Sequence, residues 1–321
     1  MNFQDLYKIE DYKFYLDTAF GRARKKQIAG LKRMDPLLKK KKQDEMKVVS
    51  VTENLATALL KIEKSFPSME SLPEFYKEMC RVSFDVDVAK KSIGAVRWAV
   101  ERVKILSRET TKNIRYSQTE QKSSTYREAF YGRVSSVMKR INKELKFLEE
   151  IRKIMKAFPT VKEKYPTVAI VGFPNVGKST LLSKITSSKV EINSYAFTTK
   201  KLLVGYRKSG NSKIQFIDTP GTLNRDEKKN NIEKQAELAI KYVADIIVYV
   251  FDPTETYTLE NQERLLKNVK KKRKPTILYM SKTDVADQDI VREISKKHKD
   301  IILDKEELIA AVNERLKKEK V

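Results

Sequence analysis

Several residue types are scarce in this chain of 321 residues, and each scarcity excludes a class of protein. The single cysteine, Cys80, excludes a disulfide framework and a cysteine-based zinc site, and it suits a reducing cytoplasm. The single histidine, His298, excludes a catalytic triad that needs histidine, and its lysine-rich helical surroundings predict an exposed helix residue. No apolar run approaches the length of a transmembrane helix, and the N-terminus lacks the apolar core of a signal peptide. We therefore expect a cytoplasmic protein with no membrane partner.

Basic residues, in contrast, are in large excess. The chain has 67 Lys and Arg against 43 Asp and Glu, a net charge of +24, of which +14 lies in the residues up to Thr160 and +10 beyond them. Basic charge on both halves is expected of a protein that rests on an RNA surface. The alternative is a general solubility adaptation in a lysine-rich organism.

Two segments of the first half concentrate the features that RNA contacts need. Residues 22 to 42 contain one acid, Asp35, and ten basic residues: Arg22, Arg24, Lys25, Lys26, Lys32, Arg33 and Lys39 to Lys42. We expect this basic block to be either a disordered arm or an element that phosphates order. Residues 110 to 126 form a polar segment in which Tyr116 and Tyr126 could stack on unpaired bases, with a solvated loop as the alternative.

The chain divides near residues 158 to 166, where Pro159 and Pro166 discourage helix in the residues before them. Ahead of this division glycines are scarce, and apolar residues recur with helical spacing over 87–107 and 126–155. Shorter helices fit 51–64 and 71–81. The sequence therefore predicts a basic, antiparallel helical bundle over residues 1–160 and a second domain over residues 161–321.

Strand and helix patterns alternate in the second domain. Short apolar runs predict strands at 167–171, 202–207, 213–218, 245–251, 276–281 and 301–303. Amphipathic runs predict helices at 178–187, 232–242, 258–271, 286–298 and 305–319. The run from Ser209 to Ser212 predicts a hairpin between the second and third strands. We expect an α/β fold with a mostly parallel, six-stranded sheet and one antiparallel edge.

A glycine-rich loop directly follows the first predicted strand. Residues 172–179 have the pattern G-x-x-x-x-G-K-S, with a helix-compatible run behind them. In such a loop the backbone wraps close to phosphate oxygens. Lys178 would contact the β- and γ-phosphates, and the Ser179 hydroxyl would bind Mg²⁺. The other residues expected around the phosphates are Phe173, Pro174, Asn175, Val176, Gly177 and Thr180.

Two further motifs follow at the ends of predicted strands and select the nucleotide. Asp218, in Asp-Thr-Pro-Gly, could hold the water shell of Mg²⁺, and Gly221 would let the next loop move with the γ-phosphate. After the strand at 276–281 comes Ser281-Lys282-Thr283-Asp284. A buried Asp284 carboxylate could accept the two guanine N–H groups that adenine lacks, while the Lys282 stem lies over the base. The sequence therefore predicts GTP and GDP as ligands.

Between these motifs, Tyr195-Ala196-Phe197-Thr198-Thr199 occupies a polar stretch. One threonine hydroxyl there would complete the Mg²⁺ shell only when the γ-phosphate is bound, which would make this segment a switch. We favour Thr199 over Thr198, although spacing alone does not separate them. A plain β-forming dipeptide is the alternative.

The motifs G-F-P-N-V-G-K-S-T, Y-A-F-T-T, D-T-P-G and S-K-T-D, in this order, resemble the Obg superfamily of TRAFAC-class GTPases. The long helical segment ahead of them is most similar to the nucleolar GTP-binding protein 1 family, and the end at Val321 resembles the short archaeal form. The resemblance implies a Ras-like P-loop GTPase domain that hydrolyses GTP to GDP and phosphate, with Lys178, Thr199 and Gly221 in catalytic roles. It also implies action in assembly of the large ribosomal subunit, on rRNA and ribosomal proteins, and we expect a monomer.

Thr222 and Ser281 depart from the pattern of related GTPases, whereas Asn175 matches an asparagine that several of them use to bind K⁺. Thr222 stands where Ras-type enzymes have the glutamine that positions water, so we expect slow intrinsic hydrolysis. Asn175 could bind K⁺ beside the phosphates, where the cation would replace an arginine finger, or merely shape the loop. Ser281 replaces an asparagine that tethers the base pocket to the phosphate loop, and no Ser-Ala motif follows 301–303, so we expect weaker nucleotide binding.

Two other functions stay open. A GTPase with this surface charge could act on another translation component, such as tRNA or a translation factor. Thr222 also fits a nucleotide-gated RNA-binding protein with negligible turnover. Binding to large-subunit particles tests the first alternative, and single-turnover hydrolysis tests the second.

Overall fold

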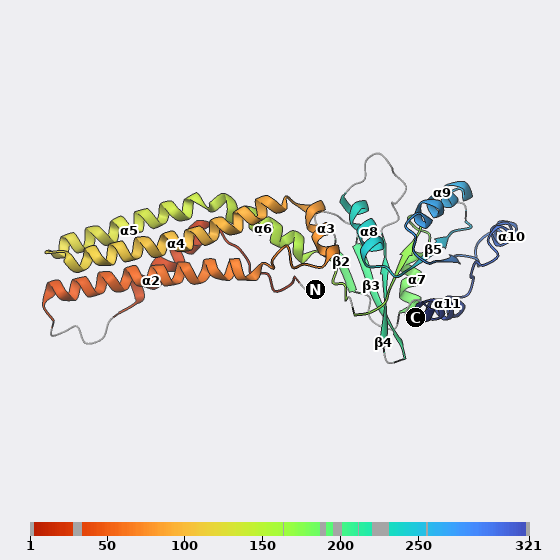
Figure 1. The fold of residues 1–321 in the computed structure, drawn as a ribbon, viewed down its shortest axis with the longest axis horizontal. Coiled ribbons are helices and arrows are strands. Elements are labelled where there is room, and N and C mark those ends of the chain that lie inside the picture. Colours follow the sequence, from red (N-terminus) through yellow and green to blue (C-terminus); the bar gives the residue numbers. More distant parts are fainter. Residues whose placement is uncertain are drawn as a thin grey trace. The chain divides into compact units, whose positions relative to one another are not determined.

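The computed structural model describes residues 3–27, 34–162, 164–186, 191–194, 201–210, 212–219, 231–254 and 256–318. These residues form two compact units (Figure 1). The helical unit comprises residues 3–71 and 84–156, and the sheet unit comprises residues 72–83 and the chain from residue 157 onward. A helix from the first half of the chain, α3 (Glu74–Ser83), therefore belongs to the sheet unit.

The helical unit is a bundle whose long helices α2, α4 and α5 lie side by side (Figure 1). Its described helices are α1 (Tyr12–Lys25), α2 (Pro36–Ser65), α4 (Val86–Tyr116), α5 (Glu120–Arg140) and α6 (Asn142–Lys156). Apolar residues three and four positions apart, such as Val48, Val51 and Leu55 of α2, are at most 1% exposed. The helical interpretation of this region is confirmed. None of the described helices in either unit combines the length and hydropathy that crossing a bilayer requires.

Most of the basic block that we expected to be unfolded or ordered only by phosphates is helical. Its first part, up to Lys25, lies in the last turns of α1, and Lys39–Lys42 lie in the first turns of α2. α2 begins there because the Asp35 carboxylate accepts a hydrogen bond from the Leu38 N–H at 3.0 Å. The expectation of a disordered arm is wrong for these helical parts, while residues 28–33 lie outside the described residues.

The polar segment 110–126 is also helical rather than a loop. α4 continues to Tyr116 and α5 begins at Glu120, so that only residues 117–119 lie between the helices. Thr110 and Ile114 are 6% and 0% exposed. One face of this segment is therefore buried, which its polar composition did not indicate.

The helical pattern over 126–155 belongs to two helices instead of one. α5 ends where Ile141 leaves helical geometry, with φ −90° and ψ 7°, and α6 starts at Asn142. Because Ile141 is itself buried, the apolar periodicity of the sequence continues through the break, and the sequence does not show where the first helix ends.

A buried carboxylate joins two helices of this unit. Asp44 of α2 is fully buried and accepts hydrogen bonds from Arg127 Nη1 at 2.5 Å and Ser123 Oγ at 2.8 Å, both on α5. Lys40 Nζ lies 3.7 Å from the same carboxylate. Because an unpaired buried charge is strongly unfavourable, we expect this network to favour one register of α2 against α5.

The sheet unit contains a mixed, six-stranded sheet in the order β2-β3-β4-β1-β5-β6. The strands are β1 (Thr167–Val171), β2 (Glu191–Ser194), β3 (Lys201–Ser209), β4 (Ser212–Asp218), β5 (Ile246–Phe251) and β6 (Thr276–Met280). Strands β4, β1, β5 and β6 pair in parallel, whereas β3 pairs antiparallel with both β2 and β4. The α/β interpretation is confirmed, but β2 was not predicted. The segment 301–303 contributes only a bridge between Tyr279 and Ile302.

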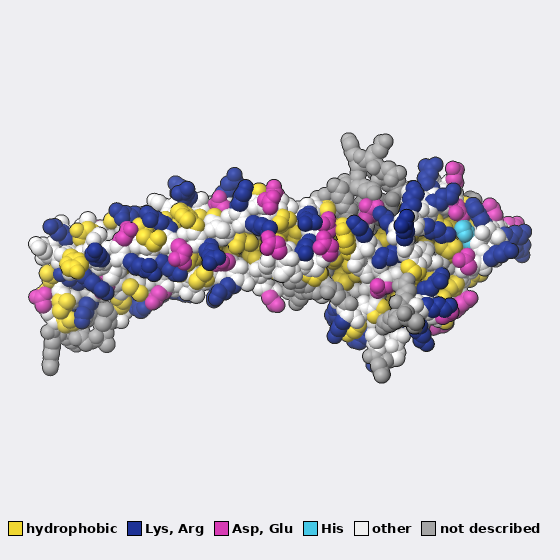
Figure 2. Space-filling model, viewed as in Figure 1, with side chains coloured by type: hydrophobic (Ala, Val, Ile, Leu, Met, Phe, Trp, Pro, Cys, Tyr) yellow, Lys and Arg dark blue, Asp and Glu magenta, His cyan; other side chains and the backbone are white. Residues whose placement is uncertain are grey.

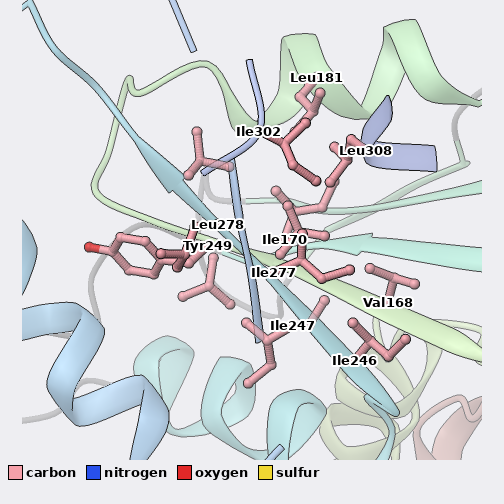
Figure 3. Close-up of a cluster of buried hydrophobic side chains, with 14 of the residues drawn as sticks. Val168, Ile170, Leu181, Ile246, Ile247, Tyr249, Ile277, Leu278, Ile302 and Leu308 are labelled. Atoms are coloured by element: carbon pink, nitrogen blue, oxygen red, sulfur yellow. The ribbon is translucent and has the colours of Figure 1, made fainter. Parts of the chain in front are cut away.

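The central strands are continuous apolar runs because helices cover the sheet. These helices are α7 (Lys178–Ile185), α8 (Asn231–Tyr242), α9 (Leu259–Lys270), α10 (Gln288–Lys297) and α11 (Lys305–Lys318). Figure 3 shows Ile170 of β1, Ile247 of β5 and Leu278 of β6 among the side chains of one buried cluster. β3 and β4 meet in the predicted hairpin, whose Gly210 has φ 58°. This core fixes the carboxyl ends of β1, β4, β5 and β6, where the candidate site residues begin.

His298 is not the exposed helix residue that we expected. It ends α10, its side chain is 13% exposed, and its Nε2 lies 2.7 Å from Glu263 Oε1. Its ring centroid is 5.1 Å from that of Phe251. The histidine therefore helps to pack the end of α10 against β5 and α9.

Candidate functional site

The glycine-rich loop lies at the carboxyl end of β1, and at its first residue, Gly172, neighbouring atoms leave no room for a side chain. A Cβ on Gly172 would come within 2.8 Å of the Val250 carbonyl oxygen and 3.0 Å of Val176 Cγ2. Asn175 (φ 62°) and Gly177 (φ 89°) adopt left-handed conformations. Gly177 caps α7 without a side-chain hydrogen bond, so the first N–H groups of the helix remain available to an anion.

Lys178 is a buried cation tied to this loop. The residue is 6% exposed, and its Nζ donates a hydrogen bond to the Phe173 carbonyl oxygen at 2.6 Å. Burial lowers the pKa of Lys178, while the nearby Asp218 carboxylate raises it. Of the remaining loop positions, Phe173 and Val176 are buried, Pro174 is half-buried, and Asn175, Ser179 and Thr180 are exposed.

Ser179 and Asp218 form the part of the site that suits a metal ion. The Ser179 hydroxyl donates a hydrogen bond to Asp218 Oδ2, whereas the buried Oδ1 has no hydrogen-bond partner among the described residues. Burial raises the pKa of Asp218, and the contacts with Ser179 and Lys178 lower it. A hydroxyl and a carboxylate oxygen are ligands that Mg²⁺ accepts. Among the described residues, no group of three or more acidic, cysteine or histidine side chains lies close enough together to hold a metal ion.

The expected base-recognition residues follow β6. Lys282 has φ 54°, and its Nζ lies 2.7 Å from Oδ2 of Asp252, whose side chain is fully buried. Burial raises the pKa of Asp252, but hydrogen bonds from Lys282 and Thr254 outweigh it and lower the pKa below its ordinary value. Asp284 is exposed, so the expectation of a carboxylate buried by the protein itself is wrong.

Ser281 joins the base-recognition segment to the phosphate loop. It is 8% exposed, and its Oγ lies 2.7 Å from the Val176 carbonyl oxygen and 3.0 Å from that of Phe251. The Phe251 carbonyl already accepts the Ser281 N–H at 3.0 Å. The hydroxyl therefore supplies a tether of the kind that we expected only from asparagine.

The loop between β5 and α9 contributes residues that the sequence analysis missed. Tyr257 stacks on Phe173 with ring centroids 4.4 Å apart and an angle of 24° between the planes. Gln262 donates hydrogen bonds to the carbonyls of Asp252 and Tyr257 at 2.8 and 2.9 Å, and its Oε1 accepts the Asp252 N–H at 2.9 Å. The one feature of the sequence that could have indicated this loop as part of the site is the acid Asp252 directly after a buried strand.

The remaining predicted residues lie outside the described residues. These are the threonines Thr198 and Thr199, together with Gly221 and Thr222. The structure thus brings together the phosphate loop, Asp218 and Ser281. Lys282 is held beside them through Asp252.

Two segments of the chain match known families. Residues 3–162 match a family described as NOG1 N-terminal helical domain, and residues 167–282 match one described as 50S ribosome-binding GTPase. Among solved structures, the G domain of the T. maritima FeoB iron transporter is 24% identical, with a TM-score of 0.41, covering 47% of this chain and 99% of that one. Era of Aquifex aeolicus bound to GDP and AlF4⁻ is 28% identical, with a TM-score of 0.36, covering 46% and 55%.

Other relatives match over most of this chain. An uncharacterised protein of Methanocaldococcus jannaschii is 42% identical over 260 residues, which is 80% of this chain and 73% of that protein. Nucleolar GTP-binding protein 1 of Drosophila melanogaster is 30% identical over 88% of this chain and 44% of its own length. The protein of that name from Encephalitozoon cuniculi is 31% identical over 83% and 53%. The chain therefore spans about half the length of these nucleolar relatives.

Proposed function

Because the chain belongs to the nucleolar GTP-binding protein 1 family, we propose that it hydrolyses GTP to GDP and phosphate and acts as an assembly factor for the large ribosomal subunit. Residues 167–282 match a GTPase family and contain the P-loop motif. The observation that carries the proposed reaction is the cluster of Lys178, Ser179 and Asp218, in which the buried Asp218 Oδ1 has no partner within the described part of the chain.

Each residue of the cluster has a defined task in this proposal. Lys178 would leave the Phe173 carbonyl and neutralise the β- and γ-phosphates, while the first N–H groups of α7 bind them. Ser179 and Asp218 would hold Mg²⁺, which when bound neutralises charge on the phosphate oxygens. Thr199 would close over the γ-phosphate, and Gly221 would let the following segment move with it.

We expect turnover without an activator to be slow. A threonine at position 222 is too short to position water as glutamine does. K⁺ held by Asn175 would compensate in part, because a cation beside the phosphates stabilises charge in the transition state. Asn175 is exposed and lies in the loop that would surround those phosphates.

Guanine selectivity would come from Asp284 and Lys282. The Lys282 stem would cover one face of the base while Asp252 holds its ammonium, as their 2.7 Å contact suggests. The Asp284 carboxylate would accept the two N–H groups of guanine, and the bound base would exclude water from it.

The proposed partner is the large subunit or its precursor, contacted through rRNA and ribosomal proteins by a monomer in the cytoplasm. Support comes from the ribosomal description of the GTPase family and from the net charge of +24. Figure 2 shows Lys and Arg side chains along the visible face of the helical unit. We propose that this unit binds RNA and that the GTPase domain times its release.

Single-turnover hydrolysis of GTP by the wild type and by Lys178→Ala tests the enzymatic half. We expect wild-type hydrolysis that depends on Mg²⁺, and a loss in the variant of at least about 2 kcal/mol of transition-state stabilisation, some thirty-fold in rate. Equal rates would contradict the proposal. An undetectable wild-type rate alongside GTP-dependent RNA binding would favour the nucleotide-gated RNA-binding protein instead.

A further inference from the structure

A groove of about 430 Å³ lies on the helical unit between α1, α2 and the segment before α1. Its floor is formed by two small residues, Ala19 and Ala58, and by the buried ring of Tyr15. The Tyr15 hydroxyl oxygen accepts the Glu10 N–H at 3.0 Å, and burial raises the pKa of Tyr15 to about 12. The Tyr15 ring on the floor is therefore held in place by its hydrogen bond and is neutral at physiological pH.

Two aromatic rings stand exposed on the rim. Tyr7 is 41% exposed and Phe14 is 52% exposed. Lys61 also lines the groove, with its Nζ 5.9 Å from the Tyr7 ring centroid, and it forms no ion pair with the described acids. Large rings beside a groove, rather than scattered singly, are typical of a binding surface.

Arg22 on the same rim is held in a fixed orientation. Its Nη1 donates a hydrogen bond to Asn54 Oδ1 at 2.7 Å, and the Asn54 amide in turn donates to the Ser50 carbonyl at 2.7 Å. The other guanidinium N–H groups of this exposed side chain can meet a phosphate in a planar, two-point contact. The one acid of the rim, Glu53, lies 3.8 Å from Lys26.

We infer that this groove binds an unpaired nucleotide of single-stranded RNA, with the base stacked on Phe14 and Tyr7 and the phosphate at Arg22 and Lys61. The volume accommodates one nucleotide, and aromatic rings interleaved with cations are the pattern that stacks bases and follows a backbone. An acidic peptide would use the cations and leave both rings in water. This inference rests on the proposed role in RNA binding, and it adds that the helical unit selects unpaired rather than duplex RNA.

Fluorescence anisotropy with labelled single-stranded oligoadenylate, and with an RNA duplex of the same length, tests the inference on the full chain. The key variant is Phe14→Leu, which keeps an apolar side chain but removes the stacking ring. We expect it to bind the single strand about five-fold or more weakly, because base stacking supplies at least that much. The slope of log affinity against log salt should stay unchanged, since no charge is lost. Duplex binding should also be unchanged.

Two further variants complete the design. Trp98→Leu removes a ring that is 40% exposed on the same unit but outside the groove, and it should bind both RNAs as the wild type does. Ala58→Leu fills the floor and should weaken single-strand binding as Phe14→Leu does. Wild-type affinity for the single strand in both Phe14→Leu and Ala58→Leu, or equal losses on strand and duplex, would overturn the inference. Because this assay contains no ribosomal particles, it tests the groove separately from the proposed role in subunit assembly, and either hypothesis can fail without the other.

Discussion

The ammonium of Lys282 lies 2.7 Å from a carboxylate oxygen of Asp252, so a loop outside the recognised GTPase motifs holds the lysine expected to cover the base. The same loop reaches the phosphate loop through the stacked rings of Tyr257 and Phe173. Ser281, directly before Lys282, contacts the Val176 carbonyl of the phosphate loop. The base and phosphate halves of the site are therefore one connected structure.

Asp252→Asn should weaken GDP binding about ten-fold, because Lys282 loses the charge that orients it, and about 1.4 kcal/mol corresponds to that factor. The amide still offers an oxygen to Thr254, so the loop should keep its fold. Calorimetric titration with GDP measures the effect, with inorganic triphosphate as a ligand whose affinity should not change. Asp289→Asn, at an exposed acid paired with Arg292, is the matched control. Unchanged GDP affinity in Asp252→Asn would remove Asp252 from the site.

Asp218→Asn should raise the melting temperature at neutral pH while abolishing Mg²⁺-dependent hydrolysis. Burial raises the folded-state pKa of Asp218 above its unfolded value. At pH values above the folded-state pKa, the ionised carboxylate therefore lowers the free energy of unfolding, and this loss of stability disappears as the pH falls through the raised pKa. The stabilisation of the variant should therefore shrink in acid. Thermal unfolding without nucleotide at neutral and acid pH measures it. A variant less stable than the wild type at neutral pH would contradict this account of the unpartnered oxygen.

Asp284→Asn should shift the nucleotide preference from GTP to XTP by at least about ten-fold, because the amide N–H suits the 2-oxo group of xanthine. Competition between the two nucleotides, with ATP as a third ligand, gives the measurement. The wild type should prefer GTP to ATP. If ATP competes as well as GTP, the exposed Asp284 does not select the base.

Hydrolysis should be faster in K⁺ than in Na⁺ at matched ionic strength if Asn175 is a cation ligand. Asn175→Gly should remove the difference between the salts, and glycine tolerates the φ of 62° at this position. A salt difference that persists in the variant would assign the cation to other residues, and equal wild-type rates would leave Asn175 as a loop-shaping residue.

Local sequence predicted the parts of the site that lie within one turn of a strand end. The phosphate loop, Asp218 and Ser281 follow buried apolar runs, and such runs fix the position of the residue that comes next. The partnership of Lys282 with Asp252 could not be predicted, because it joins residues thirty positions apart whose spacing has no motif. At position 281 the sequence did not predict that a serine hydroxyl reaches the Val176 carbonyl, and the expectation of weaker nucleotide binding stays a prediction.

The helical unit was predicted less well, for reasons of composition. Ser123 and Thr110 are buried although their side chains are polar, so the segment around them read as a loop. Asp44 is buried through pairing with Arg127, a contact between helices that no periodicity shows. The like charges around Lys39 suggested an unfolded chain, but the Asp35 cap starts a helix there.

Binding to large ribosomal subunits as a function of salt tests the central claim most directly. The comparison is between the wild type, Lys39→Gln/Lys42→Gln in the basic block, and Lys143→Gln/Lys146→Gln, an equal charge change at exposed positions of α6. We expect co-sedimentation of the wild type with GTP bound, and weaker binding with a shallower salt dependence in the first variant only, because phosphate contacts set that slope. GTP binding and hydrolysis should be equal in all three. Absence of wild-type co-sedimentation would contradict the assembly role. Identical salt dependence in the two variants would show that the basic block contributes only to the overall charge and makes no specific contact with the subunit.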